Sequence, residues 1–165
     1  MTSTAWKAVP GRKSLNNTFR YGAGTITILM ESAETGGAFG LIEVLAKSGA
    51  EPPLHVHERE DETFYILEGK VAVWVGGEVH NLNTGDSIFL PRGVPHTFRI
   101  KSAVVRALNY ISPGGFEEWF RTLGTPAKSF DLPECIEAPS QEELKDLVKM
   151  SARFGNRVLG PAPEF

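Results

Sequence analysis

Short runs of alternating apolar and polar residues, separated by glycine-rich turns, occupy residues 22–112 of this 165-residue chain. Alternation with a period of two is typical of strands whose two faces meet different surroundings. A helical reading of this region fails because glycines interrupt the sequence roughly every ten residues. Many short strands at regular spacing predict an all-β sandwich or barrel.

Nine segments of this region are predicted to be strands, with turn signals between many of them. The strands are Gly24–Met30, Phe39–Lys47, Leu54–His57, Thr63–Leu67, Val71–Val75, Glu78–Leu82, Ser87–Leu90, His96–Lys101 and Ala103–Ile111. The turn signals are Gly36-Gly37, Glu68-Gly69, Gly76-Gly77, Asn83–Asp86 and Pro91–Gly93.

The C-terminal third predicts two helices instead of strands. Apolar residues in Phe116–Leu123 recur at i, i+3, i+4 and i+7, which is typical of an amphipathic helix. Ser140 followed three residues later by Glu143 has the spacing of a capping box. It predicts a second helix from Gln141 to about Arg153, closed by Gly155.

Length and composition suggest one domain, residues 1–165, with a barrel core at about 22–112 and a helical C-terminal extension at 113–165. A net charge of −3 gives no reason to expect nucleic acid as a partner. No apolar run approaches membrane-spanning length, and residues 1–13 lack the apolar core of a signal peptide. A single cysteine allows no intrachain disulfide. We therefore expect a soluble, cytoplasmic protein without a membrane partner.

Three of the four histidines belong to two spaced arrays. The first array consists of Gly49, five residues, His55, one residue, His57, four residues, Glu62, six residues and Gly69. The second consists of Gly85, five residues, Pro91, one residue, Gly93, two residues and His96. Any one of these histidines alone would be interpreted as an ordinary core or surface residue. Together, three imidazoles and one carboxylate predict a metal site.

The predicted ligands are His55, His57, Glu62 and His96. Residues two apart on a strand share a face, so His55 and His57 point the same way. Borderline nitrogen and hard oxygen without thiolate favour one divalent ion, namely Fe, Mn, Ni, Co, Zn or Cu. Four ligands on a six-coordinate ion leave about two positions open, whereas a closed tetrahedral zinc would leave none. The net positive charge of such a site favours an anionic substrate oxygen.

Other residues are candidates for the substrate pocket. Those expected to share the face of the ligands, or to lie near it, are Phe64, Ile66, Trp74, Phe98, Ile100 and Tyr110. Each of them could equally be ordinary core, and Tyr110 is more often structural at the end of a barrel. The aromatic helix that carries Phe116, Trp119 and Phe120 is predicted to plug one barrel end. His80 and Arg92 are expected at the surface, Arg106 is expected to need a partner, and nothing marks Cys135 as reactive.

The two arrays resemble the signature motifs of the cupin superfamily, G-x5-H-x-H-x4-E-x6-G and G-x5-P-x-G-x2-H-x3-N. Ile100 stands where the second motif ends in Asn, which argues against germin-like or oxalate-specific assignments and leaves the ligand set intact. The segments Glu62–Gly69 and Gly114–Phe120 resemble those of single-domain quercetin 2,3-dioxygenase-like cupins.

The resemblance implies a jelly-roll β-barrel, one metal held by the four predicted ligands, and a homodimer. It implies a dioxygenase that acts on a flavonol-like or other enolic or aromatic small molecule, with O2 as second substrate. Glu62 would then also serve as a general base toward the substrate hydroxyl or as a hydrogen-bond partner to it. A metal-dependent isomerase or decarboxylase, and a cupin that binds a small molecule without catalysis, remain as alternatives.

Overall fold

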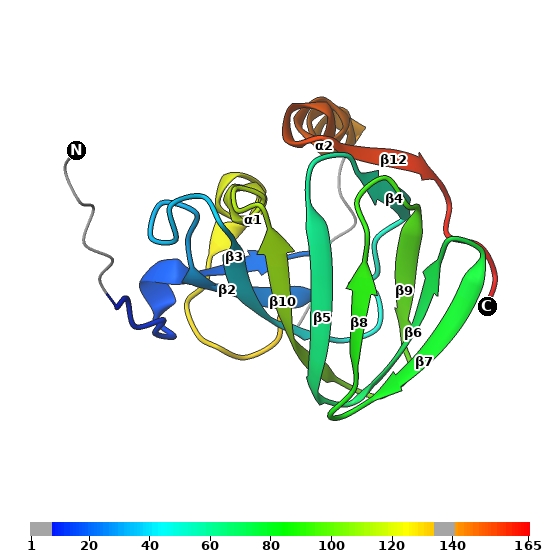
Figure 1. Ribbon diagram of the computed structural model, residues 1–165, viewed down its shortest axis with the longest axis horizontal. Coiled ribbons are helices and arrows are strands. Elements are labelled where there is room, and N and C mark those ends of the chain that lie inside the picture. Colours follow the sequence, from blue (N-terminus) through cyan, green and yellow to red (C-terminus); the bar gives the residue numbers. More distant parts are fainter. Residues whose placement is uncertain (1–7, 134–140) are drawn as a thin grey trace.

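A computed structural model describes residues 8–133 and 141–165, with side chains of the last helix described from residue 147 onward. Strands account for most of the ordered structure (Figure 1). They are β1 (Thr18–Tyr21), β2 (Gly24–Met30), β3 (Gly40–Ala46), β4 (Leu54–His57), β5 (Asp61–Glu68), β6 (Lys70–Val75), β7 (Glu78–Asn83), β8 (Ser87–Leu90), β9 (His96–Ile100), β10 (Val105–Ser112), β11 (Thr125–Pro126) and β12 (Asn156–Gly160). The helices are the 3-10 turn η1 (Leu15–Asn17), α1 (Glu117–Leu123) and α2 (Gln141–Phe154).

Two antiparallel sheets form the body of the molecule. The first has seven strands in the order β11-β1-β2-β3-β10-β5-β8, and the second has five in the order β12-β4-β9-β6-β7. The sheets do not close into one continuous hydrogen-bonded barrel, so the predicted jelly roll takes the double-sheet form. Figure 1 shows α1 and α2 at one end of this sandwich, the end at which β4 finishes and β12 starts, where His57 pairs with Asn156.

The inward faces of the sheets carry two apolar clusters. The cluster at the end away from the helices consists of Ala46, Ile66, Val71, Val73, Leu82, Leu90, Ile100, Val105 and Ala107. The cluster beneath the helices consists of Phe19, Ile26, Ile28, Ile42, Ile111, Phe116 and Trp119, with Leu147, Met150 and Phe154 of α2 packed against it. Both helices are thus held by their apolar stripes, as the 3.6-residue period of α1 predicted.

The nine strands predicted from alternation correspond to β2 through β10, and their bounds differ by at most a few residues. Both helices of the predicted C-terminal extension are present, but the sequence reading missed β12, which returns to the five-stranded sheet and pairs with β4. This strand is short and lies at the sheet edge, so it shows no clear alternation. The predicted cap Ser140 and the residue Cys135 lie outside the described residues.

One glycine of the first array is required by its surroundings. Gly69 has a φ of +93°, and a Cβ atom there would lie 2.3 Å from the carbonyl oxygen of Val104. Only glycine can occupy that turn without displacing the neighbouring backbone. The described helices include none with the length and apolar character that crossing a bilayer requires.

Candidate metal centre

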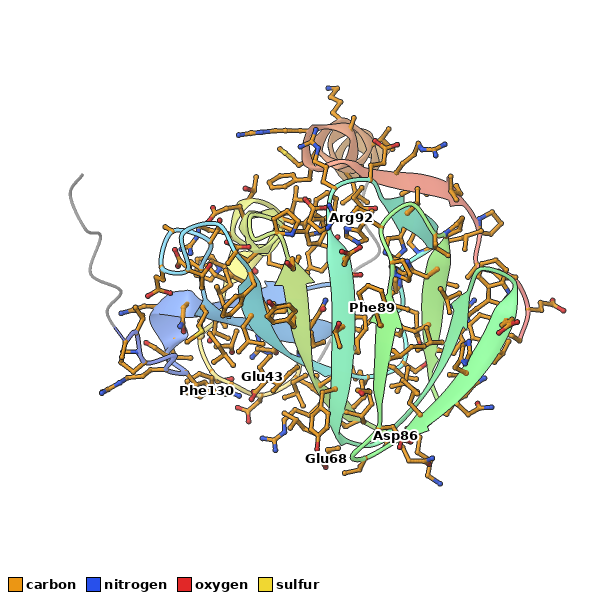
Figure 2. All side chains as sticks on the ribbon, in the orientation of Figure 1. Glu43, Glu68, Asp86, Phe89, Arg92 and Phe130 are labelled. Carbon is orange, nitrogen blue, oxygen red and sulfur yellow. The ribbon has the colours of Figure 1, made fainter. Side chains whose placement is uncertain are left out.

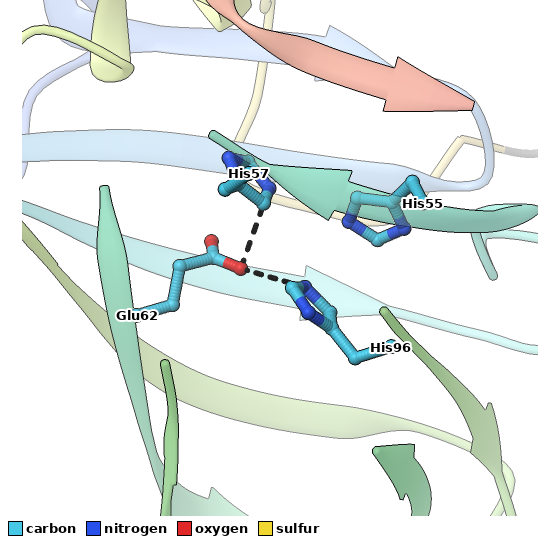
Figure 3. Close-up of side chains that lie close together, drawn as sticks. All are labelled: His55, His57, Glu62 and His96. Atoms are coloured by element: carbon cyan, nitrogen blue, oxygen red, sulfur yellow. Dashed lines mark hydrogen bonds and ion pairs between the residues drawn. The ribbon is translucent and has the colours of Figure 1, made fainter. Parts of the chain in front are cut away.

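The two sheets bring the four predicted ligands together between them. His55 of β4 and His96 of β9 are direct partners across the five-stranded sheet, and His57 lies two residues further along β4 on the same face. Glu62 projects toward them from β5 of the seven-stranded sheet (Figure 3). One potential ligand atom from each of the four side chains lies within 4.8 Å of the others, and all four side chains are buried.

The protonation pattern of the imidazoles suits a cation. Nδ1 of His55 lies 2.9 Å from the carbonyl oxygen of Pro53, and Nδ1 of His96 lies 3.0 Å from that of Val94. A carbonyl oxygen can only accept a hydrogen bond, so these Nδ1 atoms carry the hydrogens in the neutral rings. In that neutral tautomer each Nε2 carries the lone pair that a metal ion requires.

A second carboxylate, which the sequence patterns did not single out, lies behind His57. Its Nδ1 lies 3.7 Å from Oε2 of Glu60, and its Nε2 lies 3.5 Å from Oε2 of Glu62. Glu60 is buried although it belongs to the acidic turn between β4 and β5. At 3.7 Å this contact is longer than a hydrogen bond, so Glu60 acts on the His57 ring chiefly through its negative charge.

Asn109 of β10 is the other supporting residue that sequence reasoning missed. Its Nδ2 donates a 2.7 Å hydrogen bond to Oε1 of Glu62, and only 3% of the residue is exposed. This bond leaves Oε2 of Glu62 to face Nε2 of His96, 3.2 Å away (Figure 3). The sequence did contain one signal for this role, because Asn109 alternates in step with Ala107 and Ile111, which face inward on the same strand.

Burial and mutual charge shift the protonation of the cluster. Burial, with the neighbouring His96 and His57, lowers the pKa of His55 to about 4, so this ring is neutral at pH 7. Burial alone would lower the pKa of His57, but the charges of Glu62 and Glu60 outweigh it and raise that pKa. Burial alone would raise the pKa of Glu62, but the imidazoles of His57 and His96 and the amide of Asn109 hold it well below its usual range. The carboxylate is therefore ionised and available as a ligand.

A cavity of about 160 Å³ opens beside the cluster. Its walls are largely apolar, with Phe64 and Phe98 from the sheets and Phe116, Trp119 and Phe120 from the start of α1. The ring of Phe116 stands edge-on to His57, with centroids 4.4 Å apart. The helix predicted to plug the barrel end thus also forms part of the cavity wall.

Of the six predicted pocket residues, two line the cavity and four do not. Phe64 and Phe98 line the cavity. Ile66 and Ile100 share their inward face but lie deeper, in the apolar cluster away from the helices. Trp74 does not line the cavity, and its neighbours on the same strand, Val73 and Val75, supply the contacts to the core.

Tyr110 points away from the cavity. The inward face of β10 is carried by its odd-numbered residues, so Tyr110 lies on the outer surface and stacks on Phe39 with centroids 4.8 Å apart. His80 is near Glu78 at the surface, and Arg92 forms an ion pair with Asp61. Nε of Arg106 is buried and has no hydrogen-bond partner among the described residues.

Comparison with known proteins gives the class of this chain. Residues 41–109, which include all four candidate ligands, match the cupin domain family. The double-sheet jelly roll and the three-histidine, one-glutamate cluster agree with that match. The chain has a cupin fold, and its sequence is similar to quercetin 2,3-dioxygenases.

Two such relatives are quercetin 2,3-dioxygenases from Bacillus subtilis and Aspergillus japonicus. The Bacillus protein is 34% identical over 106 residues, which are 64% of this chain and 32% of the relative. The Aspergillus protein is 38% identical over 78 residues, which are 44% of this chain and 22% of the relative. The aligned parts therefore span a third or less of these relatives.

A solved cupin structure has the same fold. The RmlC-like cupin from Shewanella frigidimarina superposes with a TM-score of 0.51 and 24% identity, over 59% of this chain and 83% of the other. Identity at this level supports the fold and not a shared activity.

Proposed function

We propose that this chain is a metal-dependent dioxygenase that adds both atoms of O2 to a flavonol-like or other enolic or aromatic small molecule. One observation supports this most directly. Three imidazoles and an ionised carboxylate converge at the wall of an apolar cavity, and protein carbonyls already bind the Nδ1 atoms of two of the rings. The similarity to quercetin 2,3-dioxygenases supplies the reaction class.

His55, His57, Glu62 and His96 would hold one divalent ion per chain, chosen among Fe, Mn, Ni, Co, Zn and Cu. When bound, the ion supplies positive charge that favours an anionic substrate oxygen. Glu62 accepts the proton of the substrate hydroxyl, because its Oε2 faces the cluster while Asn109 holds its Oε1. Phe64, Phe98 and Phe116 exclude water and hold the ring of the substrate.

The size of the cavity bears on the substrate. An apolar cavity of about 150 Å³ accepts one benzene molecule. A cavity of about 160 Å³ beside the candidate ligands therefore holds one aromatic ring completely. A flavonol would place its oxygen-bearing ring inside and extend its remaining rings toward the opening, whereas a catechol would enter as a whole.

Metal content and oxygen consumption test the proposal. Protein reconstituted with each candidate metal should contain about one ion per chain by elemental analysis, and flavonols or catechols should then drive oxygen uptake. With labelled O2, both oxygen atoms should appear in the product. Absence of metal after reconstitution at neutral pH would reject the site.

The variant Glu62→Gln separates the two tasks of the carboxylate. As a general base, Glu62 should affect turnover more than substrate binding, so kcat falls while the Kd of the substrate changes little. Equal effects on both would leave Glu62 with a ligand role only. His80→Gln is the matched control, because His80 lies at the surface away from the cluster.

Two alternatives use the same four residues. A metal-dependent isomerase or decarboxylase would turn over at full rate under nitrogen, and that result would exclude the dioxygenase. A non-catalytic small-molecule-binding cupin would bind a candidate tightly and release no product under air or nitrogen.

We further propose that the chain forms a homodimer through the outer face of the seven-stranded sheet. Tyr65, Phe89 and Tyr110 are exposed on neighbouring strands of this face, and Phe89 stands on the edge strand β8 (Figure 2). Sedimentation velocity should show a dimer that Phe89→Glu converts to a monomer. A wild-type monomer at micromolar concentration would contradict this proposal.

A further inference from the structure

Three polar side chains of the cavity have an oxygen without a hydrogen-bond partner. Oδ1 of Asn109, Oγ of Ser151 and Oδ1 of Asn156 are buried, and no partner for them exists among the described residues. All three residues line the cavity beside the candidate ligands. Ser151 is only 5% exposed. Because a buried polar atom without a partner destabilises a fold, its presence calls for a functional explanation.

The pairing of the last strand places one of these residues on the same face as the candidate ligands. In the pairing of β12 with β4, Asn156 lies opposite His57 and Val158 lies opposite His55. Directly opposed residues of an antiparallel pair point to the same face, so Asn156 shares the inward face of the histidines. Ser151 lies one helical turn beyond Leu147 on α2, and both residues line the cavity.

The chemistry of these atoms calls for a ligand that donates hydrogen bonds. Nδ2 of Asn109 is committed to the carboxylate of Glu62, so Oδ1 of this side chain is an acceptor. Oδ1 of Asn156 is a second acceptor, and Oγ of Ser151 can accept as well. Among the described residues, no lysine or arginine lines the cavity, so nothing there would bind an anionic group of the ligand away from the cluster.

We propose that Ser151 and Asn156, with Asn109, form a subsite for a ring hydroxyl, so that the cavity prefers an aromatic ring with three neighbouring hydroxyl groups over one with two. This inference deepens the proposed function, because the candidate metal would anchor two oxygens of the ring. The third hydroxyl donates to an oxygen of the subsite. The single-ring size of the cavity places that hydroxyl within its walls.

Anaerobic binding to the zinc-loaded protein tests the subsite without turnover. The probes are pyrogallol, which has three neighbouring hydroxyls, and 3-fluorocatechol, in which fluorine replaces one of them and cannot donate. Isothermal titration calorimetry under nitrogen should show wild type preferring pyrogallol roughly tenfold. In Ser151→Ala combined with Asn156→Leu, the preference should fall below about twofold. Comparing ratios cancels the difference in acidity between the probes.

Ser87→Ala is the matched control, because Ser87 is exposed on β8 outside the cavity, and it should keep the wild-type ratio. A wild-type ratio near one, an unchanged ratio in the double variant, or no binding of pyrogallol would overturn the subsite. If wild type shows no preference for pyrogallol but still consumes oxygen, only the subsite is rejected. If wild type prefers pyrogallol but consumes no oxygen, only the proposed dioxygenase activity is rejected.

Thermal unfolding of Ser151→Ala gives a readout that needs no ligand. If the hydroxyl serves a ligand and not the fold, its removal should leave Tm unchanged or raise it, since a buried atom without a partner disappears. A fall of more than about 3 °C would show that the hydroxyl stabilises the fold, and it would overturn the assignment of Ser151.

Discussion

Replacing Asn109 with Leu should weaken metal binding by about 10- to 100-fold. The side chain donates a 2.7 Å hydrogen bond to Oε1 of Glu62 and is 3% exposed, so the donor that is lost lies away from bulk solvent. A buried hydrogen bond to a charged group contributes roughly 1.5–3 kcal/mol. At about 1.4 kcal/mol per tenfold, that energy corresponds to one to two decades in Kd. Leucine has a similar volume, so the change removes the donor with little change in packing.

Competition with a chromophoric zinc chelator at fixed pH measures this effect directly. The control is Asn81→Leu on the outer strand β7, where the asparagine is exposed and far from the cluster in the sheet order. Circular dichroism should show that both variants keep the β-sheet signal. If Asn109→Leu binds zinc within twofold of wild type, then Asn109 does not orient Glu62 and the reasoning is refuted.

Three further predictions concern the fold and its protonation. In the metal-free protein, the pKa of His55 falls from 6.5 to about 4 on folding, so the unfolded state takes up more protons between these values. The free energy of unfolding should therefore fall by about 3 kcal/mol as the pH drops through this window. Urea titrations at several pH values should show this loss in wild type but not in His55→Gln. Gly69→Ala should lower Tm by several degrees more than Gly85→Ala, since both have positive φ but only Gly69 has atoms within 4 Å of the added Cβ; equal losses would contradict the steric argument. Glu117→Gln should lower the free energy of unfolding by about 2–4 kcal/mol in denaturant titrations, because both carboxylate oxygens of this buried residue accept hydrogen bonds from backbone N–H groups. A change below about 0.5 kcal/mol would contradict this prediction.

The central strands and the convergence of the four candidate ligands could be predicted because their signals are local. Alternation within a strand places His55 and His57 on one face, and the glycine turns limit where the next strands start. Glu62 and His96 were predicted from the spacing of the arrays and the cupin resemblance, and the strand pairing explains why that spacing works: His55 and His96 are opposed across one sheet.

The supporting residues could not be predicted because their signals are tertiary. Asn109 acts through a hydrogen bond to a residue 47 positions away on a neighbouring strand. Glu60 looks like one more charge of an acidic turn until the turn is seen to bury it behind His57. Tyr110 shows the opposite error, since an aromatic residue near the end of β10 fits a pocket by type while its strand parity turns it outward.

The pairing of β4 has a consequence for how the site matures during synthesis. β4 shares one register pair with β9 but four with β12, so the segment that carries two of the histidines is held mainly by residues 156–160. A ribosome releases β4 roughly a hundred residues before this partner, at about 5–20 residues per second. For those seconds the nascent β4 has an open edge, and zinc or iron offered too early would meet histidines that are not yet aligned.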